Sequence, residues 1–230
     1  MALALDATSS KTNDVVSSST HAHTCAGSDR VLYVQVLAYD SNSTTNSVPS
    51  GVTYNSVALT KIIEEVWNDG TASVGVTTWR LIAPATGANN IVVTLGSNVD
   101  NVDVSGISFT GAHQTTPEDA TSKTQSTTSR DPVGISLTST VNDTYLISCI
   151  QFFNAGGGSA SVGQTEFLNE HSGFNVASYS AGGTSGTETH SYTRGANDWG
   201  ILNMVAVKPA ATVSTAIKDM IGGGFILFPR

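Results

Sequence analysis

The stretch from Trp79 to Leu95, WRLIAPATGANNIVVTL, restricts the possible folds of this chain more than any other part of it. Residues 79–83 are extended and mostly apolar, residues 84–87 have the Pro and Gly of a turn, and residues 90–95 return as a second strand. This order predicts an antiparallel hairpin formed by residues 74–83 and 90–95. A chain built from such units folds into β-sheets rather than packed helices.

A second strong strand is predicted over residues 31–39, VLYVQVLAY. Alternate side chains of a strand point to opposite faces of the sheet. One face carries Leu32 and Val34 together with the apolar residues that follow them at the same period, and we expect it to be buried. The other face carries Tyr33 and Gln35, and we expect it to be half exposed.

Short segments of the same kind recur up to residue 210. They are rich in β-branched residues, and only 12% of the chain is charged, against a usual share of about 25%. One of them also fits a helical period, but its neighbourhood favours a strand. The further predicted strands are residues 15–25, 52–54, 57–66 (the ambiguous one), 102–109, 134–138, 145–153, 162–168, 175–180, 188–193 and 199–207.

Two connections stand out between these strands. Asn68-Asp69-Gly70 is typical of a hairpin turn. Residues 110–130 are long and polar, and we expect a surface loop there. Many short strands with turns between them predict an all-β fold, an antiparallel β-sandwich of the jelly-roll kind, in one domain over residues 1–210.

The last twenty residues have a different character. Residues 212–221 have the apolar spacing of one short helix, and the glycines at 222–224 would end it. Residues 225–228, FILF, are apolar throughout. An apolar terminus is usually tied down by packing, because its exposure invites aggregation. We therefore expect residues 211–230 to form a C-terminal assembly or anchoring tail.

The order of several short motifs resembles a family of β-sandwich domains found in phage structural proteins and in bacterial surface or extracellular proteins. These motifs are VTYNSVALT at 52–60, WRLIAPATG at 79–87, IVVTL at 91–95, SFTGA at 108–112, and Trp199 followed by VAVKPA at 205–210. The resemblance covers about residues 1–210. It implies a jelly-roll-like fold and a virion or surface setting, and it transfers no catalytic residue. Family members often have Gly where this chain has Ser56.

Charge and hydropathy exclude several kinds of partner. The formal net charge is −8 and the pI is about 4.9, so we expect neither nucleic acid nor an anionic membrane surface as a partner. The N-terminus lacks the basic and apolar regions of a signal peptide, and no apolar run reaches the length of about 18 residues that a membrane-spanning helix needs. We expect synthesis in the cytoplasm.

The thiols and a nearby pair of histidines allow two chemistries. Cys25 and Cys149 are far apart and match no zinc spacing. Free buried thiols are favoured over a disulfide between strands. His21 and His23 alternate with Cys25 on one strand face and could ligate a transition metal. A polar strand face is the favoured interpretation, because no fourth ligand can be identified, and we expect no metal and no cofactor.

Two aspartates raise the question of calcium. Asp100 and Asp103 could help to bind Ca²⁺ in a loop, but a solvated turn is the favoured interpretation.

Catalysis is not indicated by any motif. The chain has no Gly-x-Ser-x-Gly elbow. His113, His171 and His190 lie in Ser-rich segments, where a nearby Ser means little. The pair Glu64-Glu65 would point to opposite faces of a strand. We expect a protein that is not an enzyme.

Aromatic residues could contact a glycan. Trp67 lies beside the predicted hairpin turn and is the best candidate for an exposed aromatic ring, with Tyr54 as a second candidate. For Trp79 and Trp199 we expect packing in the core instead.

These observations predict a non-enzymatic structural protein of a phage or virus-like particle, such as a capsid decoration, tail or fibre-associated subunit. Its partners would be further copies of itself and other virion proteins, and its location the virion. The alternative is a carbohydrate-binding module at a cell surface or outside the cell, which would bind a host-surface glycan. The predicted subunit interface lies in the tail and consists of Ile217, Met220, Ile221, Phe225, Ile226, Leu227 and Phe228.

Overall fold

The computed structural model describes residues 1–42, 46–153, 157–195 and 198–211, and these are almost entirely β-strand. The elements are β1 (Ala4–Cys25), β2 (Val31–Asp40), β3 (Gly51–Tyr54), β4 (Val57–Ala58), β5 (Thr60–Asn68), β6 (Ser73–Ile82), β7 (Gly87–Thr110), β8 (Glu118–Arg130), β9 (Val133–Ser139), β10 (Thr144–Phe152), β11 (Ser159–Ala160), β12 (Thr165–Glu170), the 3₁₀ turn η1 (His171–Gly173), β13 (Asn175–Gly183), β14 (Gly186–Thr193) and β15 (Asp198–Val207).

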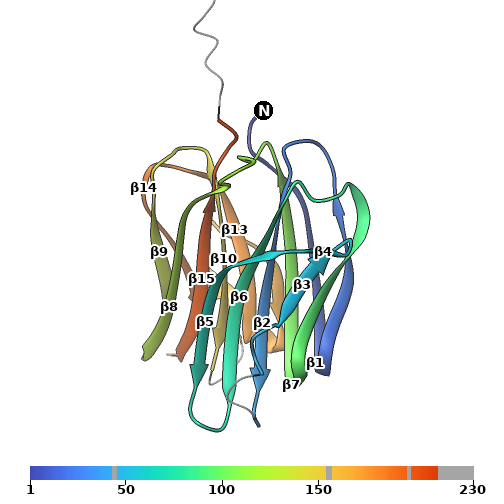
Figure 1. Ribbon diagram of the computed structural model, residues 1–230. Helices are drawn as coiled ribbons and strands as arrows, with labels where there is room; N and C mark the ends of the chain where they lie inside the picture. Colours follow the sequence, from blue (N-terminus) through green and yellow to red (C-terminus); the bar gives the residue numbers. More distant parts are fainter. Residues whose placement is uncertain (43–45, 154–156, 196–197, 212–230) are drawn as a thin grey trace, which may run out of the picture.

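The strands form three antiparallel sheets that divide the chain into two halves. The first sheet has the order β4-β3-β7-β2-β6-β5, with β1 paired to β7, and uses only strands of the N-terminal half, residues 1–112. The C-terminal half, residues 113–211, supplies the sheet β12-β13-β10-β15-β8 and the sheet β11-β14-β9. Figure 1 shows the two halves side by side, with their strands running along the long axis of the molecule. The all-β antiparallel sandwich expected from the sequence is confirmed.

The longest strand pair, β1 with β7, covers one face of β2. The later part of β7 pairs with β2, while residues 91–94 pair with β3. The two parts of β7 face each other, because a Cβ placed on Gly106 would lie 2.7 Å from Cδ1 of Ile91. A larger residue at 106 would therefore require the side chains of Ile91 and Ser9 to shift. The space between them is filled by a buried apolar cluster that includes Leu32, Val34, Val36, Val52, Tyr54, Ile91 and Val93.

The opposite face of β2 is covered by the C-terminal half. One shared apolar cluster joins Val31, Tyr33, Ile63, Ile107 and Phe109 to Ile147, Val205 and Val207. A second joins Leu37, Val74 and Val76 to Cys149, Leu168, Ala177 and Ile201. The expectation of a half-exposed face on this strand is wrong, since Tyr33 and Gln35 are both fully buried. The physical reason is that a second sheet packs where solvent was expected.

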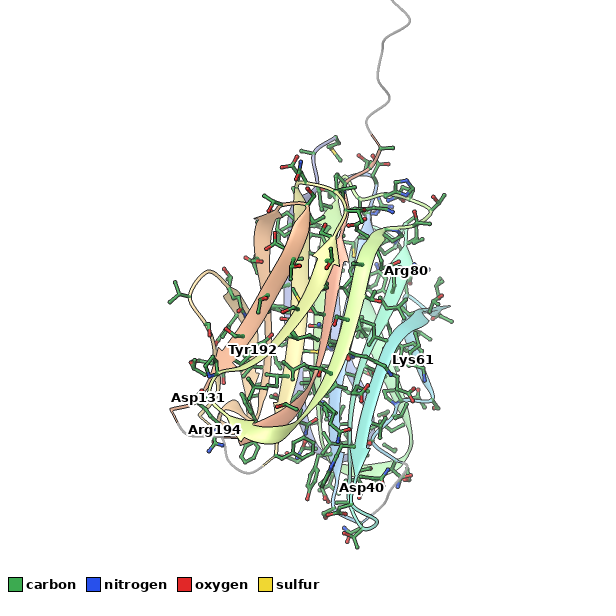
Figure 2. The ribbon with its side chains drawn as sticks, turned by 90° about the vertical axis from the view of Figure 1, so that its left-hand side faces the viewer. Asp40, Lys61, Arg80, Asp131, Tyr192 and Arg194 are labelled. Atoms are coloured by element: carbon green, nitrogen blue, oxygen red, sulfur yellow. The ribbon has the colours of Figure 1, made fainter. Side chains whose placement is uncertain are left out.

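We call this contact between the two halves the seam. Polar pairs at its margins join the halves. Arg80 Nη1 lies 2.6 Å from Glu118 Oε2, and Tyr33 Oη donates to Glu118 Oε1 at 2.8 Å. Figure 2 shows Arg80 and Lys61 on the side of the N-terminal half and Tyr192 on the side of the C-terminal half.

The outer face of the C-terminal half has its own core. Strands β9, β11 and β14 cover β10, β13 and β15 from the side away from the seam. The cluster between these layers contains Val133, Ile135, Leu137, Leu146, Ile150, Phe152, Val176, Tyr192, Leu202 and Met204. The molecule is thus a stack of sheets with three apolar layers between them.

Two expectations about strand pairing are wrong. Strands β6 and β7 do not form a hairpin, because β2 lies between them and pairs with both. The connection from β6 passes over the start of β2, where Ala83 N donates to Arg30 O at 2.9 Å. Residues 102–109 are not a separate strand, because they continue β7.

The expected surface loop at 110–130 is also wrong over most of its length. Strand β8 pairs with β15 from Asp198 to Val207 and forms the margin of its sheet. A marginal strand buries little surface, so its polar composition resembles that of a loop.

Several local predictions are confirmed. The hairpin turn at 68–70 joins β5 to β6, with Asn68 opposite Ser73. The segment at 57–66 is strand rather than helix. Cys25 and Cys149 are free and buried. The strand expected at 162–168 begins later, at Thr165. No helix in the described part of the chain is long and apolar enough to cross a membrane.

The seam should carry much of the stability. Ile147 is fully buried there, so Ile147→Ala should lower the free energy of unfolding by about 2–5 kcal/mol through lost apolar contact and a residual cavity. Val57 is 52% exposed, and Val57→Ala should change that free energy by less than about 0.5 kcal/mol. Urea unfolding followed by circular dichroism measures both, and equal effects would contradict this role of the seam.

Candidate functional site

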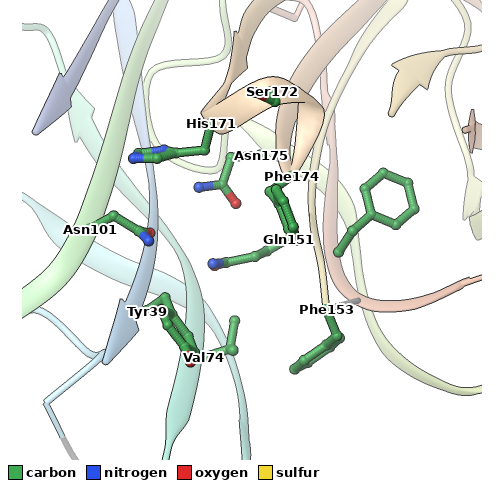
Figure 3. Close-up of a pocket in the computed structure, with 10 residues that line it drawn as sticks. Tyr39, Val74, Asn101, Gln151, Phe153, His171, Ser172, Phe174 and Asn175 are labelled. Carbon is green, nitrogen blue, oxygen red and sulfur yellow. The ribbon is translucent and has the colours of Figure 1, made fainter. Parts of the chain in front are cut away.

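A pocket of about 490 Å³ opens at one end of the seam. Figure 3 shows its lining, which comes from both halves of the molecule. Strands β2, β6 and β7 contribute Tyr39, Val74 and Asn101. The C-terminal half contributes Gln151, Phe152, Phe153, His171, Ser172, Phe174 and Asn175. The pocket therefore exists only because the two halves are joined.

The turn η1 forms one wall of this pocket. His171, Ser172 and Gly173 have φ values of 49°, 56° and 82°, in the left-handed region that favours glycine. Phe174 N donates to His171 O at 3.3 Å, and Gly158 N donates to Gly173 O at 3.1 Å. Such a backbone persists only where its surroundings hold it.

The side chain of His171 is held between two carboxylates. Nδ1 lies 2.7 Å from Asp103 Oδ2 and Nε2 lies 3.0 Å from Asp14 Oδ1. Burial lowers the pKa of His171, but hydrogen bonds and charge from Asp14 and Asp103 outweigh burial, so the net pKa is raised. With both nitrogens engaged, His171 has no free lone pair with which to act as a general base. It joins β1 and β7 to the C-terminal half.

The carboxylate of Asp103 is the buried centre of this contact. It is fully buried, and burial raises its pKa while hydrogen bonds from Asn175 and His171 act in the opposite direction. Asn175 Nδ2 donates to Asp103 Oδ2 at 2.6 Å. The solvated turn expected at Asp103 is therefore wrong, because the seam covers it.

Two amides of the lining carry a buried oxygen without a partner in the described chain. These atoms are Oε1 of Gln151 and Oδ1 of Asn101. Oδ1 of Asn175 is also buried and unpaired. Figure 3 shows the amides of Asn101, Gln151 and Asn175 directed toward the same open space. Buried polar groups normally have partners, so this set is available to a ligand.

A chain of side-chain hydrogen bonds around His23 resembles a catalytic arrangement but has the wrong order. Ser9 Oγ lies 2.8 Å from His23 Nδ1 and 3.1 Å from His21 Nε2. His23 Nε2 lies 3.0 Å from Ser108 Oγ, which donates to Asp6 Oδ2 at 2.8 Å. In a Ser-His-Asp triad the carboxylate binds the imidazole directly, whereas here a hydroxyl stands between them.

Burial also governs the chemistry of this strand face. It lowers the pKa of His21 to about 4, with a contribution from Lys11, and the pKa of His23 to about 4, with a contribution from His21. Burial raises the pKa of Cys25. In the described residues, no group of three or more His, Cys, Asp and Glu could hold a metal ion.

A third histidine is enclosed within the outer core of the C-terminal half. His190 Nδ1 lies 2.6 Å from Ser148 Oγ, and Nε2 lies 2.8 Å from Ser180 Oγ. Burial lowers the pKa of His190 to about 4. His113 lies apart from these, beside Thr115 and Thr116. His113, His171 and His190 thus have different partners, and they do not form one site.

The two candidate glycan contacts from the sequence differ in outcome. Tyr54 is fully buried, and its Oη lies 3.0 Å from Gly87 O and 3.2 Å from His23 O, so it offers no ring face to a sugar and the expectation is wrong. Trp67 is half buried and packs edge-to-face on Phe153, with ring centroids 4.6 Å apart. Its contact with a glycan stays a prediction.

The other predicted residues lie as follows. Trp79 is 6% exposed, which confirms core packing. Asp100 Oδ2 accepts a hydrogen bond from Ser41 N at 2.7 Å. The side chain of Trp199 and the tail residues Ile217, Met220, Ile221, Phe225, Ile226, Leu227 and Phe228, together with the short helix expected at 212–221, lie outside the described part.

Sequence reasoning missed the pocket. Tyr39, Asn101 and Gln151 are far apart in the chain, and each lies at the end of a strand or within one. The amide residues were one indication of the pocket in the sequence, because Asn and Gln are unusual within apolar strands.

The chain matches no protein-family model, and neither the curated proteins nor the solved structures contain a significant match to it.

The buried histidines should make the protein sensitive to acid. The pKa of His190 is about 4 when folded, so it stays neutral while the unfolded chain takes up a proton near 6.5. Its contribution to stability is complete above pH 6.5 and decreases as the pH falls toward 4. At about 1.4 kcal/mol for each pKa unit, the loss is on the order of 3 kcal/mol.

His190→Gln removes this proton-linked loss. Urea unfolding at pH 7 and pH 5 should show a smaller decrease in the free energy of unfolding for the variant than for the unaltered protein. An identical decrease in both would show that His190 does not contribute.

Proposed function

We propose that this protein is a non-enzymatic structural subunit of a phage or virus-like particle, of the capsid-decoration, tail or fibre-associated kind, that assembles through its C-terminal tail. The observation that carries this proposal is the long free edge of β1, beside which the described chain ends. The motif order that resembles β-sandwich domains of phage and bacterial surface proteins supports a virion setting.

Strand β1 offers a site for an additional strand. It spans Ala4–Cys25 and pairs only with β7 among the described strands. The outer backbone groups of β1 make no backbone hydrogen bond in the described chain. Its register shifts between Leu5 and Ala7 and between Val16 and Ser18, so the edge is divided into straight segments. An unpaired strand edge is a template for pairing with another segment.

The described chain ends close to the start of this edge. Ala210 N donates to Gly111 O at 2.7 Å. A Cβ on Gly111 would lie 2.1 Å from Ala2 O, so Ala2 and Ala210 are neighbours on either side of Gly111. Figure 1 shows the N-terminus and the last described residues at the same end of the molecule.

The segment 212–230 is therefore positioned to reach such an edge. At about 3.3 Å for each extended residue, it can span on the order of 60 Å, which is enough to pair with either part of β1, a strand that folds back so that Ser9 lies beside His21 and His23. Its apolar residues 225–228 can also pack on a neighbouring copy. We assign the free edge of one subunit to the tail of the next, which gives a homo-oligomer.

The titratable groups support a role without catalysis. His23, His171 and His190 have both ring nitrogens engaged. Burial raises the pKa of Cys25 and Cys149, which makes both thiols poor nucleophiles at neutral pH.

Deletion of residues 211–230 tests the role of the tail. The full chain should form a defined oligomer, and the deletion variant should be a folded monomer, as measured by light scattering after size exclusion with circular dichroism as the check of folding. The double variant Phe225→Ser with Phe228→Ser retains the tail length and should weaken assembly, because it removes apolar contact. Equal masses for all three proteins would contradict assembly through the tail.

A further inference from the structure

The pocket at the seam has no residue of β1 in its lining and has features of a ligand site. We propose that it binds a neutral, hydroxyl-rich ligand, namely the terminal sugar of a glycan. This inference does not depend on the proposed role in assembly. Its volume of about 490 Å³ lies within the range of roughly 300–1,000 Å³ that is usual for small-molecule pockets.

The first support is the unpaired amide of Gln151. Gln151 is only 4% exposed, its buried Oε1 has no hydrogen-bond partner in the described chain, and Figure 3 shows the amide directed into the pocket. An unsatisfied buried polar group costs about 1–3 kcal/mol, and because Gln151 faces the pocket, a ligand there can supply the partner that Oε1 lacks. A sugar hydroxyl can donate to Oε1 and accept from Nε2 at once.

The second support is the arrangement of further polar groups around the same space. Asn101 faces Gln151 from the other half of the molecule, and Asn175 lies between His171 and Gln151 (Figure 3). Tyr39 also lines the pocket. Amides and hydroxyls that both donate and accept match a ligand with several adjacent hydroxyls.

The third support is charge. None of the ten residues drawn in Figure 3 is Asp, Glu, Lys or Arg. The one titratable imidazole, His171, is balanced by the carboxylates of Asp14 and Asp103, and Asp103 is not among the lining residues. A divalent cation needs carboxylate ligands and a phosphate needs basic ones, so a neutral ligand fits best.

The fourth support is the aromatic lining. Tyr39, Phe153 and Phe174 provide apolar surface for the C–H faces of a sugar ring. Trp67 packs on Phe153 from behind, which holds that ring in place. The tight turn η1 and the clamp on His171 fix the opposite wall. The pocket is therefore formed before a ligand enters, which lowers the entropic cost of binding.

The test is binding of the methyl glycosides of glucose, galactose, mannose and N-acetylglucosamine to the full chain, measured by calorimetry and saturation-transfer NMR. At least one should bind saturably. Gln151→Met keeps the size of the side chain and removes its amide, so it should weaken that binding at least tenfold. Gln35→Met makes the same change at a buried glutamine outside the pocket and should leave binding unaltered.

Asn101→Ala provides a second variant at a half-buried position, where folding is less at risk, and it should also weaken binding. The proposal is overturned if no glycoside binds saturably, if Gln151→Met and Asn101→Ala bind like the unaltered protein, or if Gln35→Met loses binding equally. It is also overturned if calcium chloride raises the melting temperature and no glycoside does.

Discussion

The rest of the molecule depends on the burial of β2 on both of its faces. Every residue from Val31 to Ala38 is fully buried. A buried aliphatic side chain contributes about 1.5–3 kcal/mol relative to an exposed one, so neither face of this strand can be left in water. One face is covered by the folded-over part of β7 with β3, and the other is covered by the C-terminal half. Each half therefore buries apolar surface that the other half would otherwise leave in water.

The seam also accounts for the polar features of the structure. Two stacked sheets bury backbone and side-chain polar groups that need partners, and Asn203 Nδ2 donates to Val76 O at 2.9 Å across the contact. At one margin of the seam, Glu118 of the C-terminal half binds Arg80 and Tyr33 of the N-terminal half. At another margin, His171 binds the carboxylates of Asp103 and Asp14. Beyond these contacts, at one end of the seam, amide and aromatic side chains from both halves line the pocket.

Strands were predictable because their pattern is local, whereas their partners were not. The strand at 31–39 and the Asn68-Asp69-Gly70 turn depend on neighbouring residues, and both were found. The short turn after β6 suggested a hairpin, but β2 lies between β6 and β7 and pairs with both. Strand β8 was missed because a marginal strand buries few apolar side chains.

The candidate site was less predictable for the same reason. The pocket brings together Tyr39, Asn101 and Gln151 only when the sheets stack. The residues next to each of them in the sequence do not predict that contact. Tyr54 was considered as a glycan contact because it is aromatic, but the folding of β7 onto itself buries it.

Two halves that share one buried seam must unfold together. Scanning calorimetry of the full chain tests this directly, since it compares the calorimetric enthalpy with the van't Hoff enthalpy of the same transition. If the two halves depend on each other, we expect a single transition whose calorimetric enthalpy equals its van't Hoff enthalpy. Two resolved transitions, with one half remaining folded after the other has melted, would contradict the central place given to the seam.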